Sequence, residues 1–94
     1  MNEKLIEKKL REEVKNLGGM ALKFSSAYHR GMPDRIVLLP GGLISFVELK
    51  STGKKPTKLQ GKAIGELKSL GFRTLVIDSK ESLESFLKEV KSHE

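Results

Sequence analysis

The 94-residue sequence contains no cysteine, no tryptophan, a single tyrosine and only two histidines. The absence of cysteine excludes a disulfide framework, a zinc site with cysteine ligands, an iron–sulfur cluster and thiol catalysis. His29 and His93 match no metal-binding spacing, so any metal must be held by carboxylates. With so few aromatic residues, stacking on unpaired bases is not expected to be the main mode of nucleic-acid recognition.

Long apolar runs are absent as well. Charged residues interrupt the N-terminal segment, and no stretch approaches 18 apolar residues, which argues against a secretory signal and a membrane-spanning helix. The lack of cysteine agrees with a reducing compartment such as the cytosol. We therefore expect a cytoplasmic protein that does not act at a membrane.

Positive charge is what the sequence has in excess. Eighteen Lys and Arg residues against twelve Asp and Glu give a formal net charge of +6, which favours a phosphate-rich partner, although many small basic proteins bind no nucleic acid. The length allows one domain, residues 1–94. A chain of this size buries only about 60–65% of the surface that it exposes when unfolded, so a homodimer would add stability.

The spacing of apolar residues predicts seven elements. Helices are expected at residues 2–17, 57–70 and 78–90. Strands are expected at residues 20–26, 36–39, 43–49 and 72–77. The resulting order, α-β-β-β-α-β-α, predicts an α/β domain in which the two central strands form a hairpin.

Glu48 stands in the predicted strand 43–49, whose two faces are both mostly apolar. This pattern is typical of a central strand covered on both sides, where a carboxylate needs a cation or a hydrogen-bond donor. Because side chains alternate along a strand, Lys50 projects to the same face as Glu48. The simplest interpretation is a buried Glu48–Lys50 ion pair without catalysis.

The length of the hairpin turn decides whether a second carboxylate joins Glu48. A three-residue turn pairs Leu39 with Leu43 and places Asp34 directly opposite Glu48. Opposed Cβ atoms are about 4.5–5.5 Å apart, which is close enough for two carboxylates to share a divalent ion. A two-residue turn would instead put Asp34 on the other face of the sheet.

Two carboxylates and a lysine on one face would form a minimal hydrolytic site. Asp34 and Glu48 would hold Mg²⁺ or Mn²⁺ through oxygen atoms, and the ion would acidify a water and neutralise charge on a phosphate. Lys50 would orient or deprotonate that water, or stabilise the pentacovalent oxyanion. The spacing thus indicates phosphodiester hydrolysis as the alternative to a structural ion pair.

Larger motifs surround these residues. Pro33-Asp34, thirteen intervening residues and Glu48-Leu49-Lys50 resemble the PD-(D/E)XK nuclease signature. Gly31-Met32-Pro33-Asp34-Arg35, Phe46-Val47-Glu48-Leu49-Lys50 and Gln60 resemble its VRR-NUC (virus-type replication–repair nuclease) branch, over about residues 5–78. The resemblance implies a restriction-endonuclease-like core, with a mixed central sheet flanked by helices.

The resemblance also implies roles for single residues. The metal ligands would be Asp34, Glu48 and the backbone carbonyl of Leu49. Lys50 would be the catalytic lysine, and Gln60 would steady Lys50 or the water.

A glutamate from the first helix completes the family's site. Alignment on the following Gly18-Gly19 favours Glu7, acting on the metal directly or through water. Glu3 and Glu13 stay open as alternatives, because a helical wheel does not separate the three.

Basic residues lie close to these motifs in the sequence. They are Arg30, Arg35, Lys54, Lys55, Lys58 and Lys62. Such a cluster around a carboxylate pocket would hold phosphates on either side of the cleaved one without reading bases. Tyr28 and His29 precede Asp34 in a loop that either touches DNA or is a plain surface loop.

The function implied by the resemblance is that of a Mg²⁺-dependent DNA endonuclease. Free-standing members of the family look like homodimeric, structure-specific nucleases of phages that act on branched DNA such as four-way (Holliday) junctions, which would place this chain in the host cytoplasm. The alternatives are a nickase, flap or linear-duplex nuclease of the same fold, and a non-catalytic nucleic-acid-binding module. A basic structural protein with no nucleic-acid role is a further alternative.

Overall fold

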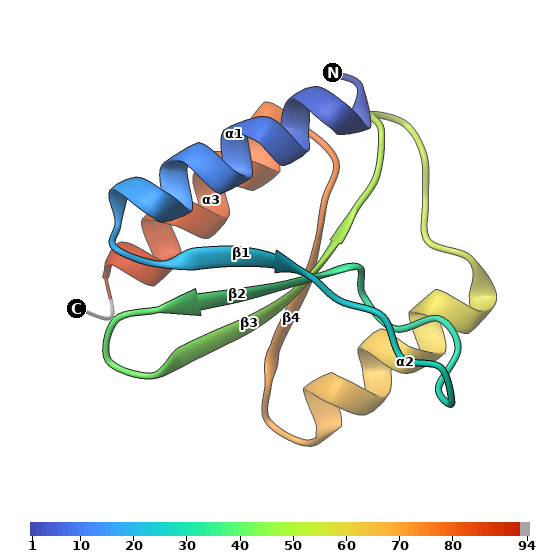
Figure 1. Ribbon diagram of the computed structural model, residues 1–94. Helices are drawn as coiled ribbons and strands as arrows, with labels where there is room; N and C mark the ends of the chain where they lie inside the picture. The colour runs from blue at the N-terminus through green and yellow to red at the C-terminus, as the bar shows by residue number, and fades with distance from the viewer. Residues whose placement is uncertain (93–94) are drawn as a thin grey trace.

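The computed structural model of the chain describes residues 1–92 and shows four strands in one sheet with three helices packed on it (Figure 1). In chain order the elements are α1 (Glu3–Asn16), β1 (Met20–Lys23), β2 (Arg35–Leu39), β3 (Leu43–Leu49), α2 (Lys58–Ser69), β4 (Arg73–Ile77) and α3 (Lys80–Lys91). The predicted order of seven elements is thereby confirmed. His93 lies outside the described residues. No helix within residues 1–92 is both long enough and apolar enough to cross a lipid bilayer.

The sheet is mixed, with strand order β1-β2-β3-β4. The pairs β1–β2 and β2–β3 are antiparallel, whereas β3 and β4 are parallel and are connected through α2. Leu39 pairs with Leu43, which confirms the three-residue hairpin turn. Gly41 and Gly42 both have positive φ, 85° and 76°, and glycine adopts this backbone conformation without steric cost.

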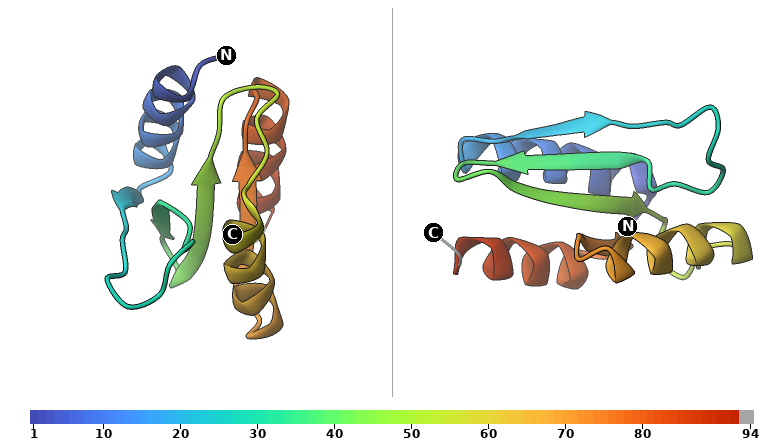
Figure 2. Two further views of the ribbon diagram at one scale, coloured as in Figure 1. Left: turned by 90° about the vertical axis from the view of Figure 1, so that its right-hand side faces the viewer. Right: turned by 90° about the horizontal axis from the view of Figure 1, so that it is seen from below.

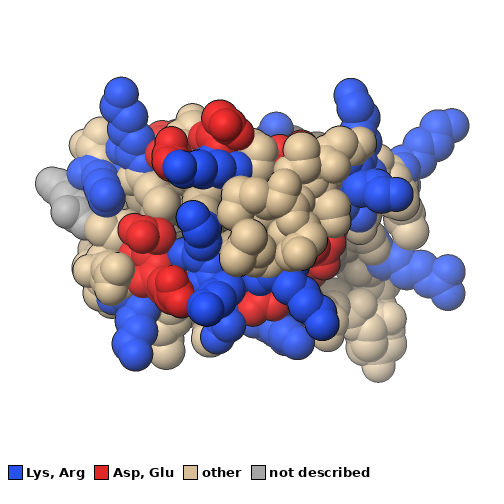
Figure 3. All heavy atoms as spheres, turned by 90° about the horizontal axis from the view of Figure 1, so that it is seen from above, with Lys and Arg blue, Asp and Glu red and all other residues tan. Residues whose placement is uncertain are grey.

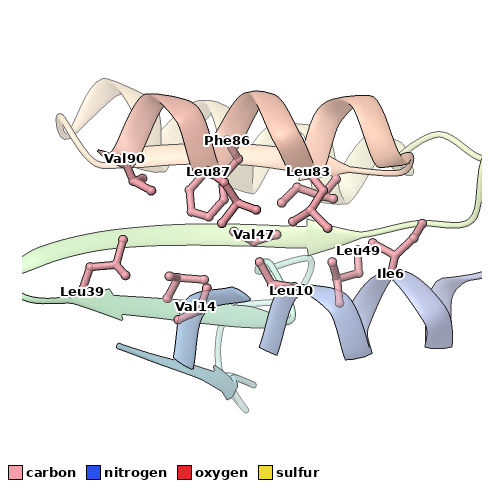
Figure 4. Close-up of a cluster of buried hydrophobic side chains, with 12 residues drawn as sticks. Ile6, Leu10, Val14, Leu39, Val47, Leu49, Leu83, Phe86, Leu87 and Val90 are labelled. Atoms are coloured by element: carbon pink, nitrogen blue, oxygen red, sulfur yellow. The ribbon is translucent and has the colours of Figure 1, made fainter. Parts of the chain in front are cut away.

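Two helices cover one face of the sheet, which we call the helical face. Apolar side chains of α1 and α3 point toward one another around Val47 of β3 (Figure 4). Ile6, Leu10 and Val14 of α1 are fully buried there, and Phe86 of α3 is 1% exposed. This face therefore holds the hydrophobic core of the molecule.

The opposite face, which we call the site face, is covered only in part. α2 packs along β4, and Ala63 and Leu67 of this helix are buried. Over the other strands no helix of the described residues crosses this side, as the view from below shows (Figure 2). Met20, Leu22 and Ile44 are accordingly 55%, 44% and 42% exposed. The expectation that both faces of β3 are covered along the whole strand is therefore wrong at its first residues.

Helix boundaries follow local capping. Thr57 caps α2 in a capping box with Gln60. Ser79 is the N-cap of α3, since its hydroxyl accepts a hydrogen bond from the Ser82 N–H, and the helix therefore begins after the predicted start at residue 78. β1 ends at Lys23 instead of residue 26, and one further hydrogen bond, from the Phe24 N–H to the Asp34 carbonyl, continues its register with β2.

Candidate active site

Asp34 and Glu48 lie side by side on the site face, at the end of the hairpin away from its turn. Asp34 directly precedes β2, and its Oδ1 accepts a hydrogen bond of 3.1 Å from the backbone N–H of Leu49. The pairing of Arg35 with Val47 continues the predicted register toward these two residues. The hairpin thus brings together the two carboxylates that the turn length predicted on one face.

Glu48 is buried, at 4% exposure, and the side chains of Gln60 and Lys50 contact it. The amide nitrogen Nε2 of Gln60 donates to Glu48 Oε2 at 3.1 Å, and Lys50 Nζ lies 3.7 Å from the same oxygen. Gln60 is oriented by its own helix, because its Oε1 accepts from the Thr57 N–H at 2.9 Å. Gln60 therefore contacts the carboxylate of Glu48, whereas the sequence had suggested a contact with Lys50 or water.

The environment of Glu48 favours its protonated form in the metal-free protein. Burial raises the pKa of Glu48 to about 7, and the negative charge of Asp34 contributes to the rise. Lys50 and a hydrogen bond from the Asp34 backbone oppose this pKa shift, and Glu3 adds a weaker increase. A cation bound beside these two carboxylates would stabilise their charged forms.

The residues present fit a hard divalent cation. Both side-chain contacts to Glu48 are made through Oε2, and the Leu49 amide binds Oδ1 of Asp34. Each carboxylate oxygen has two lone pairs, so both side chains keep acceptor capacity for a further ligand. No group of three or more His, Asp or Glu side chains suited to a metal occurs within residues 1–92. Mg²⁺ is commonly held by one or two carboxylates, with waters and substrate phosphates filling the remaining positions. Asp34 and Glu48 provide this kind of donor set.

Comparison with known proteins gives a consistent answer. No family model matches the chain. The chain is 47% identical over 81 residues to a protein named "Putative nuclease p44" from Acyrthosiphon pisum secondary endosymbiont phage 1, covering 86% of this chain and 87% of that protein. A solved structure described as a "VRR_NUC domain" superposes with a TM-score of 0.85 at 30% identity, over 92% of this chain and 94% of the other.

The chain belongs to the VRR-NUC family. A second solved structure, a "VRR_NUC domain protein", shares the fold with a TM-score of 0.72 at 16% identity, over 94% of this chain and 86% of that one. The VRR-NUC assignment confirms the resemblance and the PD-(D/E)XK-like fold. It also supports a nuclease activity for this chain.

Two expected site residues of this VRR-NUC chain, Glu7 and Arg35, contact each other at the edge of the cleft that Asp34 also lines. Arg35 is 7% exposed on the helical face, where its Nη2 donates to Glu7 Oε2 at 2.8 Å. Glu7 Oε1 also lies 2.7 Å from Arg11 Nε. Successive strand residues point to opposite faces, so Arg35 turns away from the side to which Asp34 points. That Arg35 holds phosphate and that Glu7 acts on the metal both stay predictions, and in the structure the Glu7 carboxylate contacts two arginines.

Glu3, one of the open alternatives, is the first-helix glutamate whose charge acts on Glu48, as its contribution to the raised pKa shows. It lines an open cleft of about 510 Å³ that Glu7 and Asp34 also line. Lys4 and Lys23 line the same cleft and were missed, because the sequence does not reveal that β1 pairs with β2 so as to place Lys23 opposite Arg35.

The remaining predicted basic residues of the VRR-NUC chain are on the surface. Arg30, Lys54, Lys55, Lys58 and Lys62 are all exposed. Viewed from above, the side chains that project at the end of the molecule near α2 are basic, whereas acidic and basic side chains are mixed over α1 and α3 (Figure 3). Thr52 anchors the segment that carries Lys54 and Lys55, since its hydroxyl donates to the Asp78 carbonyl at 2.8 Å.

Proposed function

We propose that this chain is a Mg²⁺- or Mn²⁺-dependent, structure-specific DNA endonuclease that hydrolyses phosphodiester bonds in branched DNA such as four-way junctions. The observation that carries the proposal is the buried Glu48 beside Asp34, with Lys50 Nζ 3.7 Å from the Glu48 carboxylate. A buried carboxylate beside a second carboxylate is costly for a merely structural protein. A metal-assisted hydrolytic site explains why this arrangement is kept.

Each residue has a distinct role in this proposal. Asp34, Glu48 and the Leu49 carbonyl would hold the metal ion, and the ion, when bound, supplies an acidified water and neutralises charge on the phosphate. Lys50 would hold the attacking water or donate a hydrogen bond to the oxyanion. Gln60 keeps Glu48 in position through its 3.1 Å hydrogen bond. Glu3 would contribute a further charge from α1.

The exposed cations would hold the DNA. Lys54, Lys55 and Lys58 lie in the segment that follows Lys50, and Lys62 is one turn further along α2. Contacts from lysine to phosphate are independent of sequence, so this surface would recognise the course of the DNA backbone and not its bases. Branch geometry, instead of base sequence, is therefore the property we expect the protein to select.

A homodimer would allow paired cuts across a junction, because a single site cuts one strand at a time. The apolar side chains left exposed on the site face, at Met20, Leu22 and Ile44, support self-association. Light scattering at several concentrations tests this, with Ile44→Asp expected to give a monomer. A wild-type protein that stays monomeric with and without junction DNA would contradict it.

The proposal is tested with labelled DNA of several shapes: a four-way junction, a flap, a nicked duplex and the linear arms of the junction. Wild-type protein is expected to cut the junction in Mg²⁺ or Mn²⁺ and not in EDTA, with Lys50→Ala as the inactive control. Preferential cutting of the flap or linear duplex would support the nuclease activity but contradict the proposed preference for four-way junctions. Binding without cutting in either metal would instead indicate a non-catalytic module.

A further inference from the structure

Tyr28 occupies an unusual position in the loop between β1 and β2. Its side chain is fully exposed, and it is the only tyrosine of a chain that has no tryptophan. A single exposed aromatic residue needs no explanation by itself. For Tyr28 the surroundings do suggest a role, because the loop that carries it is held in place against α2.

Three contacts fix this loop. His29 Nε2 lies 3.0 Å from Glu66 Oε2 of α2, and the His29 N–H donates to Ser26 Oγ at 3.2 Å. Gly31, at φ +79°, approaches α2 so closely that a Cβ there would lie 2.6 Å from the Leu59 carbonyl oxygen. The chain thus contacts α2 at His29, directly after Tyr28, and again at Gly31.

The tip of the loop and the surface of α2 enclose a small hollow of about 220 Å³. The residues around it include the ring of Tyr28, Leu59 and the two exposed cations Arg30 and Lys62. An aromatic ring beside two cations is the combination that binds an exposed base and the phosphates next to it. We call this group, Tyr28, Arg30 and Lys62, the aromatic shelf.

The same two elements build the aromatic shelf and the carboxylate pair. The loop that carries Tyr28 ends at Asp34, and α2 carries both Lys62 and the Gln60 that bonds to Glu48. A DNA strand with its phosphate at Asp34 and Glu48 would thus lie against the two elements that carry the shelf. The shelf is therefore placed to sense the nucleotides next to the cleaved bond.

We propose that Tyr28 stacks on an unpaired or splayed base at the branch point, while Arg30 and Lys62 bind the adjoining phosphates. This inference rests on the proposed function and names what would give it selectivity. In continuous duplex the bases are already stacked on one another, so the ring gains nothing without unstacking a pair. At a branch, bulge or single-stranded end a base face is free. The shelf thus favours DNA with open bases over intact duplex.

The single tyrosine makes the proposal directly measurable. In EDTA, where no cutting is expected, the intrinsic tyrosine fluorescence reports on Tyr28 alone. It should be quenched when the protein binds a four-way junction or a flap, and should remain unchanged when it binds a linear duplex of the same length. Equal fluorescence in all three complexes at saturation would overturn the proposal.

Variants separate stacking from loop structure. Tyr28→Ala should weaken binding to the junction or flap by about tenfold and leave binding to linear duplex unchanged, whereas Tyr28→Phe should bind like the wild type. Leu70→Ala is the matched control, because Leu70 is 72% exposed at the other end of α2. Equal loss on all DNA shapes, or no loss with Tyr28→Ala, would contradict stacking. Comparing junction with flap shows which source of free bases the shelf prefers.

The outcome is independent of the test of the proposed function. If the wild type cuts branched DNA in Mg²⁺ and Tyr28→Ala cuts and binds equally well, only the aromatic shelf is refuted. If no DNA is cut but the fluorescence is quenched by branched DNA, the nuclease proposal fails and the shelf stands as a binding site.

Discussion

On the helical face of the sheet, α1 and α3 bury a continuous apolar core. On the site face α2 covers β4, Glu48 is buried beside the partly exposed Asp34, and several apolar side chains are left exposed. The same strands supply both faces. Val47 and Leu49 face the core, while Glu48 between them points to the other side. The comparison teaches that stability and chemistry are separated within a single strand, one residue apart.

The largest expected effect follows from removing a carboxylate on the site face. Glu48→Gln or Asp34→Asn should lower the rate of metal-dependent DNA cleavage by about a thousandfold or more, because the cation loses a charged ligand. DNA binding should be retained, since a negative charge facing phosphate is removed. Gel assays of cleavage and of binding in EDTA measure both, with the exposed Glu84→Gln of α3 as a control that keeps activity. Cleavage at wild-type rate by either site variant would refute the assignment of the site.

A pair of variants on opposite faces tests whether the helical face contributes more to the free energy of unfolding than the site face. Phe86→Ala should lower the free energy of unfolding by about 3–5 kcal/mol, because it leaves a cavity in the core. Ile44→Ala, on the site face and 42% exposed, should cost less than about 1 kcal/mol. Urea unfolding followed by circular dichroism gives both values. Equal costs would show that the site face contributes to the core as much as the helical face.

The site face should also make the stability of the protein depend on pH, because it contains the buried carboxylate of Glu48. The pKa of Glu48 is raised to about 7 in the folded protein, so the folded state binds the proton more tightly than the unfolded chain does. The resulting stabilisation is complete below about pH 4.5 and is lost as the pH rises through 7, an effect of at most about 3 kcal/mol.

Urea unfolding of the metal-free protein at pH 5 and pH 8 measures this loss. Glu48→Gln should show a smaller decrease over the same interval, and the difference between the two proteins isolates Glu48 from His29, whose pKa is also raised, mainly by its hydrogen bond to Glu66. Parallel pH profiles for the two proteins would contradict the role of Glu48.

The smallest effect concerns Gln60, which has both a structural and a positioning role. Gln60→Ala removes the hydrogen bond to Glu48 and also its part in the capping box of α2. Thr57→Ala removes only the cap, so each variant should lose about 1 kcal/mol of stability. Cleavage should fall about tenfold further in Gln60→Ala than in Thr57→Ala. Equal activities of the two variants would show that Gln60 acts only as a capping residue and does not position Glu48.

Much of the fold could be predicted from the sequence because local rules agree with it. Apolar spacing located α1 and α3, and Thr57 marked the start of α2. The length of the hairpin turn, together with the alternation of side chains along the strands, was enough to predict that Asp34 and Glu48 lie on one face. These are properties of neighbouring residues and are visible in one sequence.

The remaining parts depend on contacts between distant segments. Arg35 is 28 positions from Glu7 and donates a hydrogen bond to its carboxylate, a contact that has no local signal in the sequence. Leu59 and Leu70 fit the apolar spacing of α2 but are 47% and 72% exposed, because the helix covers only one edge of the sheet. The attachment of His29 to Glu66 likewise has no local signal.

The three-residue turn between β2 and β3 also limits how this chain can vary. Adding or removing one residue there would exchange the faces of β2 relative to β3, so that Asp34 would enter the core and Val37 would leave it. Adding two residues preserves the alternation. Among descendants of this sequence that keep the carboxylate pair, length changes in this turn should therefore come in steps of two, unless a bulge restores the parity.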